Sequence, residues 1–350
     1  MSASAAVSES LPLEGLAHYL NAQGLCDGGP VSAVPLTGGQ SNPTFRLHAG
    51  ARRYVLRKKP VGLLLGGAHA IDREYRVIKA LQDSEVPVPR TYVYCDDPAI
   101  IGTPFYIMEY LDGRVFEDQS LTGMRPLERG AIYREMVRVL AALHRVDYAG
   151  TGLQDYGKPG NYFARQIARW SRQSKASEVP VNDAMHRLMD WLPAHIPPDD
   201  RTTLVHGDYR LDNLVFHPEE PRVIGVLDWE LSTLGHPMSD LAYQCMSWHI
   251  PPSLWRGIGG LDLGALGIPS EREYMALYGG RATDHGVTEH WDFYLAYSLF
   301  RMAAILYGIA ARAAQGNAAA ADAAEIGRRA GPLADLAWQR AASLRHSMEK

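Results

Sequence analysis

The chain has 350 residues, of which 46% are hydrophobic and 21% charged, so it can bury a sizeable core as one large domain or two lobes. Its formal net charge of −4 provides no global basic field for nucleic acid, so a bound polyphosphate has to be held by local donors. The 3 cysteines form no CxxC pair, which argues against a disulfide scaffold or structural zinc and favours a reducing, cytoplasmic compartment.

Neither a secretory signal nor a membrane span is expected. Residues 1–10 lack a charged region followed by a long apolar one. The most apolar segment, 291–313, is broken by Asp292, Arg301 and Arg312, so it is expected to be a buried helix. We expect no membrane or nucleic-acid partner, and the sequence makes no prediction of the oligomeric state.

The first third of the chain predicts an antiparallel sheet with helices beside it. Residues 11–24 and 68–82 show the apolar spacing of amphipathic helices. Between and after them, short apolar runs alternate with glycine- and proline-containing turns, as in a meander of strands. The predicted strands are 31–36, 44–47, 53–57, 91–95 and 104–108.

The pattern changes at about residue 112, after a short connector at 108–113. This change predicts an N-terminal lobe over 1–112 and a mostly helical lobe over 113–350. Two short strands, 214–217 and 222–227, are expected within the helical lobe. The predicted helices there are 127–145, 239–249, 271–279, 288–313 and 319–348.

Residues 204–216, LVHGDYRLDNLVF, combine polar groups with apolar flanks. Asp208 follows Gly207, which permits an unusual backbone conformation, and its carboxylate could accept a hydroxyl proton. Asn213 and the later Asp228 offer oxygen ligands of the kind that Mg²⁺ prefers. The alternatives are a surface turn at Asp208, a turn cap at Asn213 and a polar strand end at Asp228. An unpaired carboxylate in that last position would be costly, and a metal ion would remove the cost.

His206 could act as a base or a metal ligand. A structural role, in which the ring bonds the backbone around the loop, is the favoured interpretation.

The segment HGD with Asn213 and Leu227-Asp228-Trp229 resembles the aminoglycoside phosphotransferase and choline kinase superfamily over roughly residues 30–310. The resemblance implies an α+β, protein-kinase-like two-lobe fold, with one helix paired to an antiparallel N-lobe sheet and a mostly helical C-lobe. It implies transfer of a γ-phosphate from ATP or GTP to the hydroxyl of a small molecule. Asp208 would be the catalytic residue, and Asn213 and Asp228 would hold Mg²⁺.

The same resemblance assigns the nucleotide-binding positions of the N-lobe. Arg57 lies where the family has lysine; it keeps the charge but differs in geometry. Glu74 would pair with it, the alternative being an exposed helix charge. Asp240 would brace the catalytic loop as a structural residue. A phosphate-covering turn and the hinge that holds adenine supply the remaining positions: Gly38, Gly39, Ser41, Asn42, Glu109 and Leu111.

A closer resemblance, in 54–60, 68–75 and 228–235, is to the kinase-like domain fused to some acyl-CoA dehydrogenases. It implies a hydroxyacyl-CoA or hydroxy acid as the acceptor. Residues 156–170, where the acceptor site usually forms, mix basic and aromatic side chains, which suits an anionic or acyl substrate. An ordinary amphipathic helix is the alternative. The acceptor candidates are Tyr162, Arg165, Arg169 and Trp170.

Three other functions stay open at this point. The first is an aminoglycoside or other amino-alcohol phosphotransferase, which differs only in its acceptor. The second is a catalytically silent nucleotide-binding or regulatory protein, for which the arginine at position 57 is the support. The third is a metal-dependent hydrolase using His206, Asp208 and Asp228, which would need further ligands.

Overall fold

The computed structural model describes residues 11–36, 42–60, 70–282, 290–315 and 323–348, which form parts of two compact units. The first unit comprises residues 1–82 and 88–112. The second comprises residues 83–87 and 113–350.

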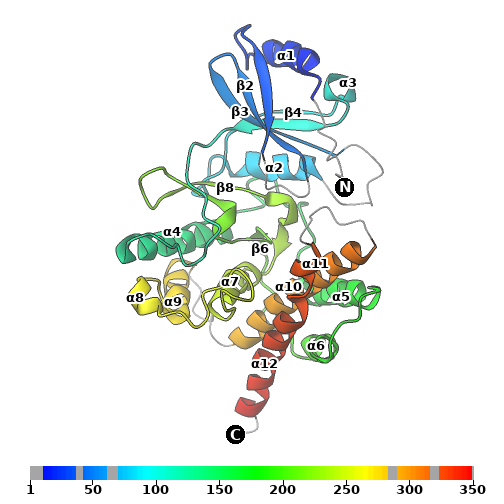
Figure 1. Ribbon diagram of the computed structural model, residues 1–350, viewed down its shortest axis with the longest axis vertical. Helices are drawn as coiled ribbons and strands as arrows, with labels where there is room; N and C mark the ends of the chain where they lie inside the picture. The colour runs from blue at the N-terminus through cyan, green and yellow to red at the C-terminus, as the bar shows by residue number, and fades with distance from the viewer. Residues whose placement is uncertain (1–10, 37–41, 61–69, 283–289, 316–322, 349–350) are drawn as a thin grey trace, which may run out of the picture. The chain divides into compact units, whose positions relative to one another are not determined.

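The first unit contains a 5-stranded antiparallel sheet in the order β1-β2-β3-β5-β4 (Figure 1). This confirms the predicted antiparallel N-terminal sheet with a helix paired to it. The strands are β1 (Val31–Pro35), β2 (Thr44–Ala49), β3 (Arg52–Lys58), β4 (Thr91–Cys95) and β5 (Phe105–Glu109). The helices are α1 (Leu13–Ala22), α2 (Ile71–Leu81) and α3 (Pro98–Ile101).

Side-chain alternation along β3 separates the two faces of this sheet. Leu56 packs in one apolar core with Leu16 and Leu20 of α1. Arg57 points to the opposite face, and its strand partner Tyr106 contacts Tyr75 of α2 with ring centroids 5.9 Å apart. The sheet therefore has α1 on one face and α2 on the other.

The second unit is mostly helical, as predicted. Its helices are α4 (Pro126–His144), α5 (Tyr162–Lys175), α6 (Asp183–Ala194), α7 (Met238–Cys245), α8 (Leu263–Leu266), α9 (Glu271–Ala282), α10 (Trp291–Ala314), α11 (Ala323–Gly327) and α12 (Ala330–Met348). Single helical turns also occur at Leu211–Asn213, Trp229–Leu231 and Met246–Trp248. The strands are β6 (Thr203–Val205), β7 (Leu214–Phe216), β8 (Val223–Val226) and β9 (Thr233–Gly235).

Two expectations about this unit were wrong. The described residues of this unit contain four strands, not two, because β6 pairs with β9 in addition to the β7–β8 hairpin. Each strand of the extra pair has only 3 residues and gains its partner through tertiary contacts, so no local pattern reveals it. The C-terminal region expected as one helix over 319–348 contains two, α11 and α12, with residues 316–322 outside the described chain.

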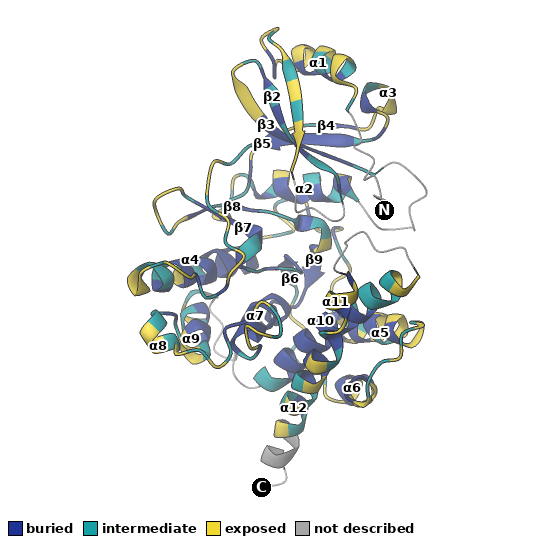
Figure 2. Cartoon of the chain, viewed as in Figure 1, coloured by how far each residue is buried: buried dark blue, intermediate teal, exposed yellow. Residues whose placement is uncertain are grey.

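Helix α10 lies beside α12 and is coloured as buried over most of its length (Figure 2). It is long and apolar enough to cross a membrane, but 78% of its most apolar window is buried inside the structure. The expectation of a buried core helix at 291–313 is confirmed.

His236, two residues before α7, should make the stability of the fold depend on pH. Burial lowers the pKa of His236 to about 4, against 6.5 for an ordinary histidine, and the Asp199 carboxylate, 3.3 Å from Nε2, opposes this shift only in part. Below pH 6.5 the unfolded chain binds the proton and the folded chain does not, so stability falls as pH falls from 6.5 to 4. We expect this residue to contribute a loss of about 2 kcal/mol between pH 7 and pH 5.

Urea unfolding at the two pH values measures that loss. The comparison variant is His236→Asn, whose side-chain oxygen can replace Nδ1 as the acceptor of the Met238 N–H (3.2 Å). An equal pH dependence in both proteins would contradict the assignment.

Candidate active site

In the first unit, the phosphate-turn residues Gly38, Gly39 and Ser41 lie outside the described residues. Asn42 is described and buried, directly before β2. Its carbonyl oxygen accepts a hydrogen bond from the Thr44 hydroxyl (3.0 Å), which shapes the start of the strand.

Arg57 and Glu74 form a buried ion pair. Arg57 Nη2 lies 3.1 Å from Glu74 Oε1, and the side chains are 10% and 1% exposed. Glu74 is in the first turn of α2 and is buried, so it is not an exposed helix charge. The pair fixes the Arg57 guanidinium on one face of the sheet, and a guanidinium can grip phosphate oxygens.

Glu74→Gln should destabilise the protein by about 3 kcal/mol, because it removes the carboxylate that faces a buried guanidinium. The free energy of unfolding in urea measures the effect. Glu85→Gln is the matched control. It breaks the Arg145–Glu85 pair (2.7 Å), in which the glutamate is 74% exposed, and should change stability by less than about 1 kcal/mol. Equal losses in both variants would contradict a buried, stabilising pair.

The predicted hinge begins at the end of β5. Glu109 is tied twice to Arg90: its N–H donates to the Arg90 carbonyl (2.8 Å), and its side chain accepts from the Arg90 N–H (3.1 Å). The backbone of Leu111 has no hydrogen bond to any part of the chain that the structure describes. A free N–H and C=O on an extended segment are the groups that the edge of a purine base can pair with.

In the second unit, the loop that carries Asp208 follows β6, and its turn requires a glycine at position 207. Gly207 has φ of 83°, and a Cβ at this position would lie 2.5 Å from the Leu231 carbonyl oxygen. Both the left-handed backbone and the lack of space require glycine. The chain can therefore turn sharply just before Asp208.

Asp240, the third residue of α7, holds the backbone of this loop through its carboxylate. Its carboxylate accepts the N–H groups of His206 (2.6 Å) and Gly207 (2.8 Å), and it lies 3.3 Å from His144 Nε2. Burial acts to raise the pKa of the Asp240 carboxyl, but the hydrogen bond and charge of His144 and the N–H donors hold it below its ordinary value. These contacts fix the backbone at His206 and Gly207.

His206 ties the loop to the end of β8. Its Nε2 bonds the Leu227 carbonyl (2.8 Å), and its Nδ1 accepts the Asp208 N–H (3.2 Å). With both ring nitrogens committed to the backbone, the structural interpretation of this histidine holds.

The Asp208 carboxylate is oriented from two sides. Asn213 Nδ2 donates to its Oδ2 (2.9 Å), and the Tyr243 hydroxyl donates to its Oδ1. Burial and then the Asp208 charge raise the pKa of Tyr243 well above its ordinary value, so this hydroxyl stays protonated and can donate. The Asp208 side chain is 15% exposed, so a hydroxyl could still reach it.

Asn213 and Asp228 flank the open end of the β7–β8 hairpin. Leu214 pairs with Val226, and the Leu227 N–H donates to the Asn213 carbonyl (2.9 Å). Asp228 itself has φ of 65°, a conformation that is rare outside glycine and is concentrated at functional sites.

These two side chains suit Mg²⁺. Asn213 commits its nitrogen to Asp208, with bonds to the carbonyl (2.8 Å) and to Oδ2, which presents its oxygen as a ligand. Asp228 adds a charged oxygen. One or two protein oxygens, completed by phosphate and water, are the usual magnesium site. The described residues contain no group of three or more His, Cys, Asp or Glu side chains that could hold a metal, as a hydrolase would need.

Three residues around Asp208 have no role predicted from the sequence: Arg210, Tyr243 and Arg301. Arg210 Nε lies 3.5 Å from Asp208 Oδ2 and 3.1 Å from Asp212 Oδ1. Tyr243 lies one helical turn after Asp240, and this spacing is the signal that could have found it. Arg301, seen from the sequence only as a break in an apolar run, donates to the Gly207 carbonyl (2.5 Å).

The four acceptor candidates lie on α5 in different surroundings. Tyr162 is buried, with its ring against the backbone of Gly235. Arg165 donates to the backbone carbonyls of Lys158 (2.5 Å) and Gly160, which holds the preceding loop. The Trp170 ring contacts two guanidiniums, those of Arg169 (5.0 Å to the ring centroid) and Arg301 (5.9 Å).

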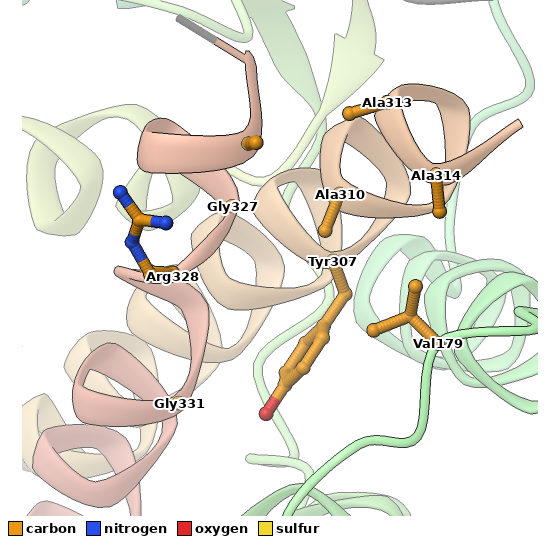
Figure 3. A pocket seen from close by; sticks show the side chains of 9 residues that line it. Val179, Tyr307, Ala310, Ala313, Ala314, Gly327, Arg328 and Gly331 are labelled. Atoms are coloured by element: carbon orange, nitrogen blue, oxygen red, sulfur yellow. The ribbon is translucent and has the colours of Figure 1, made fainter. Parts of the chain in front are cut away.

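A separate cavity of about 460 Å³ lies between α10 and α11–α12 (Figure 3). Tyr307 and small residues such as Ala310 and Gly327 line it, with Arg328 at its edge. None of the side chains around Asp208 lines this cavity, so it is distinct from the candidate site.

A kinase-like sheet with a buried cation–glutamate pair, and a helical unit carrying the HGD loop, define the class of protein. The family model described as the phosphotransferase enzyme family matches residues 32–277. The chain belongs to this family of phosphotransferases.

Among solved structures, the chain is similar to one from Ralstonia eutropha JMP134, solved as a candidate aminoglycoside phosphotransferase. The two share 54% identity with a TM-score of 0.87, over 95% of this chain and 99% of that one. Aminoglycoside phosphotransferase APH(4)-Ia, in a ternary complex with AMP-PNP and hygromycin B, has a TM-score of 0.59 at 15% identity, over 92% of this chain and 98% of that one. The second similarity shows the fold alone.

Curated relatives include acyl-CoA dehydrogenase family member 10 of Mus musculus, 46% identical over 94% of this chain. Family member 11 of Homo sapiens is 43% identical over 86% of this chain. The chain spans 31% and 39% of the length of these two proteins, so it corresponds to their kinase-like part.

Proposed function

We propose that this protein is a Mg²⁺-dependent small-molecule kinase that transfers the γ-phosphate of ATP or GTP to the hydroxyl of a hydroxyacyl-CoA or hydroxy acid. The observation that carries the proposal is the Asp208 carboxylate. It is fixed by Asn213 and Tyr243 and is still 15% exposed. That arrangement suits a base for a hydroxyl proton.

The reaction balances with the residues present. The bond between the γ-phosphorus and the β–γ bridging oxygen breaks, and a bond from the acceptor oxygen to that phosphorus forms. Asp208 takes the proton that the hydroxyl loses. Arg57 would hold nucleotide phosphates, and Asn213 and Asp228 would hold Mg²⁺, which supplies charge neutralisation when bound. Nucleotide binding has the support of the AMP-PNP complex among the structural neighbours.

Two observations favour an acyl acceptor. The relatives named as acyl-CoA dehydrogenases are 43–46% identical to this chain, which connects the kinase-like part to acyl-CoA chemistry. Helix α5 places a cationic and an aromatic side chain together at two of the predicted acceptor positions: the guanidinium of the exposed Arg169 lies 5.0 Å from the centroid of the Trp170 ring. A polycationic acceptor would need carboxylates there, whereas this cation suits an anionic or acyl group.

An aminoglycoside or other amino-alcohol acceptor is the second candidate, because the structure at 54% identity was solved as a candidate aminoglycoside phosphotransferase. The test is a panel of hydroxyacyl-CoAs, hydroxy acids, choline-like alcohols and aminoglycosides, each with ATP and with GTP. Phosphorylated products are identified by mass spectrometry. We expect turnover with hydroxylated acyl compounds. Turnover with aminoglycosides alone would overturn the choice of acceptor and leave the kinase chemistry standing.

A further inference from the structure

A buried arginine lies in the middle of the apolar helix α10. Among the described residues of the second unit, Arg301 and Asp240 are the two Asp, Glu, Lys or Arg side chains that are buried, at 6% and 0% exposure. A charge in such a position is costly unless it does something that an apolar side chain could not.

The two buried charges hold the same residue from opposite sides. The Asp240 carboxylate accepts the Gly207 N–H (2.8 Å), and the Arg301 guanidinium donates to the Gly207 carbonyl (2.5 Å). Charge-assisted hydrogen bonds of this kind are stronger than neutral ones. The backbone on both sides of Gly207 is therefore fixed, and this is the residue whose left-handed turn directs the chain into Asp208.

Arg301 also contacts the residue that orients the Asp208 carboxylate. Its guanidinium lies 5.0 Å from the ring centroid of Tyr243, whose hydroxyl donates to Asp208 Oδ1. No carboxylate within the described chain lies within 4.0 Å of Arg301 to form an ion pair. Burial acts to lower the pKa of Arg301, but Tyr297, Tyr243, Tyr162 and the Asp208 charge keep it above the ordinary value, so the group remains a cation.

We propose that Arg301 is a positioning residue for phosphoryl transfer: together with Asp240 it clamps the Gly207 peptide groups, and through Tyr243 it fixes the direction of the Asp208 carboxylate. This inference rests on the proposed role of Asp208 as the base. Arg301 acts through Gly207 and Tyr243 and does not need to touch the nucleotide.

The test compares Arg301→Met, Arg301→Lys and Asp208→Asn, with Arg312→Met as the control at an exposed site on the same helix. Transfer is measured to the acceptor that the panel identifies or, where it identifies none, from ATP to water. We expect Arg301→Met to lower kcat on the order of 100-fold, because displacing a catalytic group by about 1 Å has an effect of this size. KM for the nucleotide should stay within about twofold, because Arg301 is proposed to act on the direction of the Asp208 carboxylate and not on nucleotide binding.

Arg301→Lys keeps the charge and a donor for the Gly207 carbonyl, so its kcat should be about tenfold higher than that of Arg301→Met. Arg312→Met should behave as wild type. If Arg301→Met does not fold, as judged by circular dichroism and thermal unfolding, Arg301→Gln replaces it as the neutral variant.

A folded neutral variant with wild-type kcat overturns the clamp while Asp208→Asn remains inactive. A rise of nucleotide KM in step with the loss of kcat, or no recovery with lysine, also overturns it, since either indicates a general packing role. An active Asp208→Asn variant instead overturns the role of Asp208, and the clamp with it.

Discussion

Asp208→Asn should nearly abolish phosphoryl transfer. We expect kcat to fall by about 100-fold to 10,000-fold while nucleotide affinity stays nearly unchanged. The substituted amide can turn its oxygen toward Asn213 Nδ2 and its nitrogen toward the Tyr243 oxygen, so both orienting contacts survive in a changed polarity. What disappears is the capacity to accept the hydroxyl proton. Steady-state kinetics with a confirmed acceptor, together with nucleotide titration, separates the two effects.

The matched control is Asp190→Asn, the same chemical change at an exposed site on α6. It should leave kcat and nucleotide affinity at wild-type values. Wild-type turnover in Asp208→Asn would show that the carboxylate is not the base. Loss of nucleotide binding in parallel with activity would show that the substitution had damaged the fold.

The second large effect is expected at the metal position. Asp228→Asn should lower kcat at least about 100-fold at limiting Mg²⁺, because the site loses its charged oxygen ligand and the neutralisation that the metal supplies. Asparagine is the informative substitution here, since like aspartate it tolerates the left-handed backbone that Asp228 adopts at φ of 65°. Alanine would add a backbone cost and confuse the result.

The dependence of kcat on Mg²⁺ concentration measures this effect. We expect the concentration for half-maximal rate to rise in Asp228→Asn and to stay at the wild-type value in the Asp190→Asn control. An unchanged Mg²⁺ dependence in Asp228→Asn would exclude this carboxylate as a ligand. The proposed kinase would then need its metal elsewhere.

The sheet of the first unit and many of the helices could be predicted from the sequence because they have local signals, whereas the helices α3, α6 and α8 were not predicted. The strands of the first unit carry alternating or continuous apolar runs between turns, and the long helices repeat apolar residues at helical spacing. The strands β6 and β9 could not be found in this way. Each has 3 residues, and what makes them strands is a partner about thirty positions away in the chain.

The same division applies to the candidate site. Asp208, Asn213 and Asp228 stood out because their spacing is short or is carried by one hairpin. The residues that surround Asp208 did not stand out, because Tyr243 comes from α7 and Arg301 from α10. They lie 35 and 93 positions after Asp208 in the chain. Packing of helices distant in sequence brings those two residues to the loop.

By itself, the sequence determined the class of chemistry, because a carboxylate, an amide and a second carboxylate at fixed spacing on a loop and hairpin need few long-range contacts to be arranged. Only the tertiary structure decided how that carboxylate is held. Hydrogen bonds and cation–ring contacts depend on atoms being within a few ångströms, and chain positions as far apart as Gly207 and Arg301 meet only once the helical core has formed.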